Sequence, residues 1–248
     1  FKQKTAYEIR LSLVGSEMCI RDRIGPVPLH TFEGFVPGTN AAALTHLQAL
    51  AATLRQPTSS PAAPTYLWGA CGSGKTHLLR ALTAQAGAQG HSNAWFDASS
   101  ALPWHFDDAW ALVLIDACEA LDASQQHAAF SLFIEAGAQG VPIVAAGALP
   151  PVDLPLREDL RTRLAWGHVF ALEPLSEGDA RAAVRREADR RGIFLSDEVM
   201  AYLLSRFSRD MQHLIALLDR LDEFALSQGR AVSVPLLKRM FEQEGAEL

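Results

Sequence analysis

An eight-residue segment, Gly69-Ala-Cys-Gly-Ser-Gly-Lys75-Thr76, constrains this chain more than any other feature of its sequence. It matches the pattern G-x-x-x-x-G-K-[ST], with the strand-like segment TYLWG running into it and a helical pattern after it. Glycines let backbone N–H groups converge on phosphate oxygens, and a helix N-terminus adds positive potential. We therefore predict a phosphate-binding loop in which Lys75 reaches the outer phosphates and the Thr76 hydroxyl holds Mg²⁺.

Strand and helix patterns alternate on both sides of this loop. Further strands are predicted at NAWFDAS (93–99), ALVLID (111–116), VPIVAAG (141–147) and GHVFALEPL (167–175). Helices are predicted over residues 41–55, 76–90 and 124–138. Asn40 is expected to cap the first helix, and Gly87 and Gly90 to end the second. This alternation indicates an α/β fold with a parallel sheet, whose central strand is the continuously apolar ALVLID.

From about Glu173 the pattern changes to helices only. Ser176 with Asp179 resembles a capping box, and Ser196 and Ser233 are predicted to begin further helices. Between them, apolar residues recur at helical spacing: Met211, Leu214, Ile215, Leu218, Leu221 and Ala225. We therefore predict a P-loop nucleotide-binding domain over residues 24–172 and a small all-helical domain over residues 173–248.

Composition narrows the functional classes. The 248 residues are 49% apolar and carry a net charge of −6, which excludes a disordered tail and argues against a dedicated duplex-DNA binder. No apolar run approaches the roughly 18 residues of a membrane span. The three cysteines (Cys19, Cys71 and Cys118) match no zinc motif, and their low density suggests a reducing, cytoplasmic environment.

Residues 1–23 (FKQKTAYEIRLSLVGSEMCIRDR) differ from the rest of the chain. They resemble the translation of a sequencing-library adapter, and we expect them not to be native. The alternative is an ordinary N-terminal strand, because EIRLSLV alternates between apolar and polar residues.

Asp116 ends the apolar strand ALVLID, where a P-loop protein places the carboxylate that orients Mg²⁺. Around it, several segments resemble the DnaA family of AAA+ replication initiators, most closely its short regulatory Hda branch. They are TFEGFVPGTN (31–40), the phosphate-binding loop, LVLIDACEAL, LRTRLAWG (160–167) and RRGIFLSDEV. The resemblance runs from about Gly25 to the C-terminus.

The resemblance implies a set of site residues. Nucleotide would be held by the loop itself (Gly69, Ala70, Cys71, Gly72, Ser73, Gly74, Lys75, Thr76) with His77. Phe35, Val36 and Asn40 would line the adenine site, and Pro174 and Leu175 would form the domain hinge. Thr76 and Asp116 would be the metal ligands. Arg163 would be an arginine finger offered to a nucleotide on a neighbouring subunit, although its spacing alone favours a surface salt bridge.

Three positions depart from the family pattern. Ala117 stands where a water-activating acid commonly follows the Asp, and Glu119 need not point the same way. The stretch Ala145–Ala148 lacks the polar residue often found there, and Gln212 replaces a nucleotide-sensing arginine, with Arg209 on another part of the helix face. We therefore expect slow intrinsic hydrolysis with nucleotide binding retained.

The implied function is regulation of replication initiation. The protein would bind ADP or ATP with Mg²⁺ and stimulate hydrolysis of DnaA-bound ATP in trans, together with the DNA-loaded sliding clamp. We expect no sequence-specific DNA binding, and weak clamp binding because Pro26-Val-Pro-Leu29 is at most a fragment of a clamp motif.

The sequence leaves open whether the protein forms homo-oligomers. The alternatives are a helicase-loader or initiator-type AAA+ ATPase and a stand-alone P-loop ATPase or kinase. The basic residues Arg181, Arg185, Arg186, Arg190 and Arg191 alternate with acids and are expected to form a solvated helix face.

Overall fold

The computed structural model describes residues 30–55, 63–206 and 211–244. Residues 1–23, the fragment 26–29, Arg209 and the side chain of Gln212 therefore lie outside the described part. The chain divides between Pro174 and Leu175 into two compact units. Within the described residues, no helix is both long enough and apolar enough to cross a membrane.

The first unit contains a five-stranded sheet in which every strand pairing is parallel. Its strands are β1 (Thr65–Trp68), β2 (Ser92–Phe96), β3 (Trp110–Ile115), β4 (Ile143–Gly147) and β5 (His168–Ala171), in the spatial order β2-β3-β4-β1-β5. All strand carboxyl ends therefore meet at one edge, which is where ligands bind in open α/β sheets. The predicted α/β fold with a parallel sheet is confirmed.

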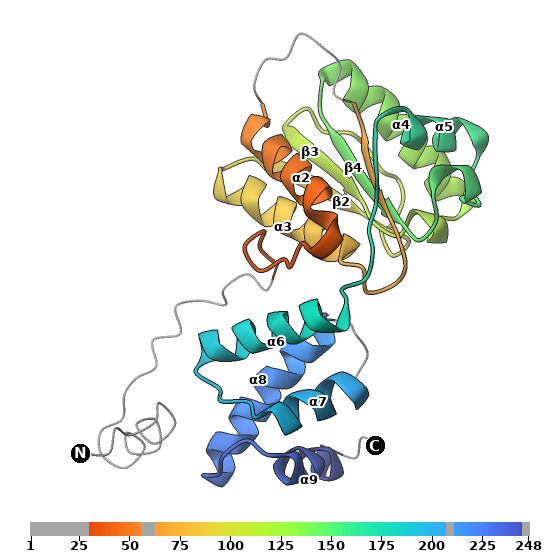
Figure 1. The fold of residues 1–248 in the computed structure, drawn as a ribbon. Helices are drawn as coiled ribbons and strands as arrows, with labels where there is room; N and C mark the ends of the chain where they lie inside the picture. The colour runs from red at the N-terminus through yellow and green to blue at the C-terminus, as the bar shows by residue number, and fades with distance from the viewer. Residues whose placement is uncertain (1–29, 56–62, 207–210, 245–248) are drawn as a thin grey trace. The chain divides into compact units, whose positions relative to one another are not determined.

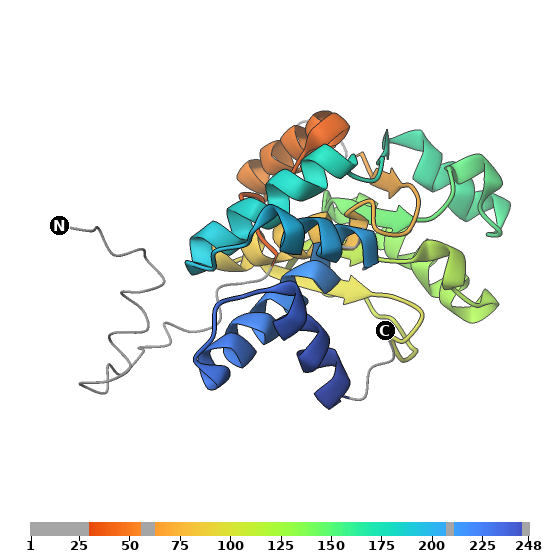
Figure 2. The same ribbon diagram turned by 60° about the horizontal axis from the view of Figure 1, so that its bottom comes forward.

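Helices cover both faces of the sheet, as Figures 1 and 2 show. Helices α2 (Ala41–Thr53) and α3 (Lys75–Ala88) pack on one face, against alternate strand residues such as Leu67 and Leu114. Helices α4 (Ala123–Gln139) and α5 (Glu158–Trp166) cover the other, against Tyr66 and Val113. Because successive strand residues point to opposite faces, the central strands are buried on both sides.

Three local predictions were wrong. The residues between the predicted strands 141–147 and 167–175, for which no helix is predicted, contain helix α5 (Glu158–Trp166), and the last strand begins at His168 rather than at residue 167. Gly87 lies inside α3, which ends at Ala88 before Gly90. The Asn40 side chain forms no capping hydrogen bond to α2, because it bonds to a distant segment instead.

The second unit consists of the helices α6 (Glu177–Arg191), α7 (Asp197–Arg206), α8 (Met211–Gln228) and α9 (Val234–Glu244). The Ser176 and Ser196 hydroxyls accept hydrogen bonds from Asp179 N and Val199 N, which confirms both as caps. A core of aliphatic side chains from all four helices holds the unit together. The predicted all-helical appendage is therefore confirmed as a fold.

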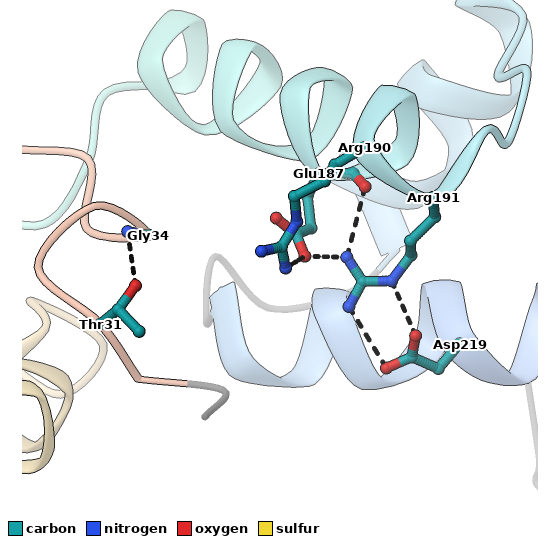
Figure 3. A network of polar contacts seen from close by, with 6 residues as sticks. All are labelled: Thr31, Gly34, Glu187, Arg190, Arg191 and Asp219. Carbon is teal, nitrogen blue, oxygen red and sulfur yellow. Dashed lines mark hydrogen bonds and ion pairs between the residues drawn. The ribbon is translucent and has the colours of Figure 1, made fainter. Parts of the chain in front are cut away.

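A polar network ties α6 to α8 within this unit (Figure 3). Arg191 donates through Nε to Asp219 Oδ1 (2.7 Å) and also pairs with Glu187 one turn earlier. Only 15% of the Arg191 side chain is exposed. The prediction of a fully solvated basic face is wrong for Arg191, because its carboxylate partners sit on two helices that pack together.

Candidate nucleotide-binding site

The loop Gly69–Thr76 leaves β1 and runs directly into α3. Gly74, the residue before the helix, has φ +94°, and a Cβ there would lie 2.7 Å from Phe35 Cε2. A Cβ on Gly69 would lie 2.1 Å from the Leu172 carbonyl oxygen. Only glycine fits these two positions, so the close approach of neighbouring segments explains part of the motif. Ala70, Cys71 and Gly72 are exposed at the tip, and Ser73 is buried.

Lys75 is the first residue of α3, and its ammonium group folds over the loop. Nζ donates to the carbonyl oxygens of Gly69 (2.7 Å) and Ala70 (2.9 Å). Burial lowers the pKa of Lys75, while the nearby negative charges of Glu119 and Asp116 oppose that change. The result is one half-buried cation at the mouth of the loop, as a phosphate site requires.

Thr76 and Asp116 come together as predicted from their positions in the chain. The Thr76 hydroxyl donates to Asp116 Oδ2 at 2.7 Å, although 40 residues separate them. Asp116 Oδ1 accepts from Ala117 N, which fixes the carboxylate at the end of β3. A hydroxyl and a carboxylate are oxygen ligands that fit Mg²⁺, which takes one or two such groups together with substrate phosphates. Among the described residues, no cluster of three or more His, Cys, Asp or Glu side chains could hold a metal.

The segment before α2 packs on the phosphate loop. Gly34 N donates to Thr31 Oγ1 (3.0 Å), which closes a tight turn (Figure 3) and brings Phe35 onto Gly74. His77, on the first turn of α3, donates through Nε2 to the Thr31 carbonyl oxygen (3.0 Å), and its ring lies 5.6 Å from the Phe35 ring. Burial lowers the pKa of His77, so this ring is neutral at pH 7. Val36, which follows the buried Phe35 in the chain, is half-buried.

Asn40 links this segment to the chain after β5. Its Nδ2 donates to the Glu173 carbonyl oxygen and its Oδ1 accepts from Glu173 N, both at 2.9 Å. Asn40 is only 4% exposed. Pro174 follows directly and is the last residue of the first unit, while Leu175 is the first of the second.

Arg163 lies on α5, on the sheet face opposite α3. Its guanidinium carbon lies 5.7 Å from the centre of the Phe130 ring on α4. No ion pair engages Arg163 within the described residues, and the neighbouring Trp166 is 65% exposed. The salt-bridge alternative for Arg163 is therefore not what the structure contains.

Glu119 lies near the carboxyl end of β4, a position that the sequence left open. Ala117 has a left-handed backbone (φ +50°, ψ +51°), and the chain turns there into a short 3₁₀ helix, η2 (Cys118–Ala120). Glu119 Oε2 then accepts a hydrogen bond from Ala148 N at 3.0 Å, at the end of β4. The sequence shows that Glu119 follows Asp116 by three residues, but the direction of the Glu119 side chain depends on the turn at Ala117.

Family models match both units. A model of the lid domain of Hda matches residues 177–241, and a model of the bacterial DnaA ATPase domain matches residues 28–95. Each of these matches falls within one of the two units of the structure.

Solved structures of replication and recombination proteins share the fold. Domain III of DnaA from Thermotoga maritima is 20% identical, with a TM-score of 0.68, 88% of this chain covered and 98% of that one. AMPPCP-bound DnaA from Aquifex aeolicus is 20% identical with a TM-score of 0.65, over 88% of this chain and 70% of that one. The branch migration motor RuvB from Thermotoga maritima is 16% identical with a TM-score of 0.59, over 82% of this chain and 68% of that one. With the two family matches, these likenesses lead to one conclusion: the chain is an AAA+ protein related to Hda and DnaA.

Proposed function

We propose that this protein is a nucleotide-binding regulator that stimulates hydrolysis of ATP bound to a DnaA-type initiator, in company with the DNA-loaded sliding clamp. It binds ADP or ATP at the loop Gly69–Thr76. Support for binding comes from the Lys75 ammonium at the loop mouth and from the Thr76–Asp116 pair. The AMPPCP-bound state of the DnaA structure from Aquifex aeolicus supports the same ligand class.

Thr76 and Asp116 would hold Mg²⁺, which neutralises phosphate charge when it is bound. Phe35 packs on the loop, and Asn40 fixes the chain near it, so both support a base-binding role for this side of the loop. Lys75 binds the outer phosphates because its three donors lie at the helix start, where the dipole of α3 is also positive.

The observation that carries the regulatory proposal is the environment of Arg163. The side chain lies on an aromatic ring, with no carboxylate partner in the described part of the chain, and on the sheet face away from α3. Arg163 and Phe130 are both half-buried, and such a cation–π contact contributes about 0.5–2 kcal/mol, so the guanidinium can leave it at modest cost. Its fork of donors then fits two phosphoryl oxygens of a neighbouring subunit's nucleotide.

The test is a single-turnover assay of initiator-bound ATP with clamp on DNA, using a chain that carries the natural N-terminal segment of the locus. We expect Arg163→Ala to lose most of the stimulation, because an arginine finger is worth about 10³–10⁵ in rate. Arg163→Lys should rescue little, because a point charge cannot make the forked contact.

The matched control is Arg161→Ala on the same helix, where Arg161 Nη1 donates to the Val152 carbonyl oxygen. It removes an equal charge and should keep the stimulation. Equal stimulation by wild type and Arg163→Ala would eliminate the proposed role. Pull-down of the replicative helicase, without initiator or clamp, would favour the helicase-loader alternative instead.

A further inference from the structure

Two departures from the family pattern meet at one place in the structure. Ala117 offers no acid after Asp116, and Ala148 offers no polar side chain at the end of β4. Glu119 lies between them, because its Oε2 accepts from the Ala148 backbone N–H. Oε1 makes no hydrogen bond within the described part of the chain and remains available. The Glu119 carboxylate therefore lies beside Ala148, at the end of β4.

The backbone around Glu119 is shaped to hold it there. The left-handed conformation of Ala117 costs a non-glycine residue about 1–2 kcal/mol, and such conformations cluster at functional sites. Cys118, only 2% exposed, anchors the turn in the core. A Cβ at Gly147 would lie 3.0 Å from Glu119 Oε2 and 2.2 Å from the Tyr66 hydroxyl, so position 147 leaves room for both.

The charge of Glu119 acts on the phosphate-binding cation. Among the charges that oppose the lowered pKa of Lys75, Glu119 exerts a larger effect than Asp116 does. Asp116 is occupied by the Thr76 hydroxyl, whereas Glu119 has one oxygen to spare. The backbone also places Glu119 beside the loop, because Gly69 N donates to the Gly147 carbonyl oxygen (3.3 Å) and Glu119 bonds to the next residue, Ala148.

We propose that Glu119 is the catalytic carboxylate for hydrolysis of the nucleoside triphosphate bound by this chain itself. Oε1 accepts a hydrogen bond, and then the proton, from the water that attacks the γ-phosphorus. The water oxygen forms the new P–O bond while the bond from the γ-phosphorus to the β,γ-bridging oxygen breaks. The diphosphate leaves with that oxygen, and Glu119 returns the proton to solvent.

The inference rests on the proposed nucleotide binding but is independent of the proposed action on the initiator. A structural role for Glu119 is the competing explanation, since its bond to Ala148 N joins η2 to β4. Glu119→Gln separates the two, because a glutamine oxygen still accepts from Ala148 N but cannot take a proton. Glu135→Gln, an exposed acid on α4, is the control for the loss of one negative charge.

Three measurements on the purified full chain decide the question: single-turnover hydrolysis of γ-labelled ATP, binding of a non-hydrolysable ATP analogue, and the thermal midpoint. We expect slow but measurable hydrolysis by wild type and Glu135→Gln, and a fall of about 100-fold in Glu119→Gln, the usual worth of a general base. Analogue affinity and midpoint should be unchanged or higher in Glu119→Gln, because a charge that repels phosphate is gone.

Each of the other outcomes overturns the inference. The first is that wild type hydrolyses no ATP, and the second is that wild type and Glu119→Gln hydrolyse it at equal rates. The third is that the analogue affinity and thermal midpoint of Glu119→Gln fall far enough to account for its lost rate. Failure of the wild type to bind the analogue refutes the proposed nucleotide binding as well. Normal binding without dependence on Glu119 refutes only the catalytic role.

Discussion

Asn40 should hold the end of the first unit in place, and Asn40→Ala should lower its free energy of unfolding. Two hydrogen bonds of 2.9 Å join the buried Asn40 amide to the backbone of Glu173. Each contributes about 0.5–1.5 kcal/mol, and Glu173 is exposed, so its freed groups can regain water. The expected loss is therefore about 2 kcal/mol.

Tryptophan fluorescence during urea unfolding measures this loss of stability in the first structural unit. All five tryptophans precede Pro174, so the signal reports on the first unit alone. With a urea slope of about 2 kcal/mol per molar, a loss of about 2 kcal/mol moves the midpoint down by about 1 M.

Thr39→Val is the matched control for this change. The Thr39 hydroxyl donates to Glu173 Oε2 at 3.1 Å in an exposed position, and its loss should move the midpoint by less than about 0.3 M. Equal shifts in the two variants, or a shift below that limit in Asn40→Ala, would refute the reasoning that the buried amide bonds carry the stability.

Two further predictions concern charge. Lys75→Ala should abolish binding of fluorescent ADP while leaving the urea midpoint within about 0.5 M, because Lys75 bonds only to loop atoms; retained binding would contradict the loop assignment. Burial and the nearby His168 lower the pKa of His46 below its ordinary value of 6.5. The unfolded chain then binds more protons in mildly acidic solution, so the free energy of unfolding should fall as pH drops below about 6.5. His46→Gln should flatten the pH dependence of the free energy of unfolding, measured by urea titrations between pH 5 and 7. An unchanged pH dependence would contradict this role of His46.

Features that are set by a local sequence pattern could be predicted from the sequence. The phosphate loop, the buried strand before Asp116 and the helices of the second unit all follow from local pattern, and the structure contains them. The meeting of Thr76 with Asp116 was also predictable, because parallel strands bring their carboxyl ends to one edge.

Features that depend on tertiary contacts could not be predicted. Asn40 has the chemistry of a helix cap, but its partner lies 133 residues away. Helix α5 spans nine residues with only Leu160 and Leu164 buried, too short a pattern to distinguish from a connector. The direction of Glu119 depends on a left-handed alanine, which no propensity scale favours.

The proposed function requires that this protein accelerate hydrolysis of the nucleotide bound by the initiator, whatever slow hydrolysis occurs in its own site. The most direct measurement places γ-labelled ATP on the initiator in one reaction and on this protein in another, with unlabelled nucleotide on the partner and clamp on DNA in both. We predict that mixing accelerates release of labelled phosphate from the initiator at least tenfold, and that this acceleration depends on Arg163 and not on Glu119. Release from the initiator at its unstimulated rate, with label lost only from this protein, would contradict the account.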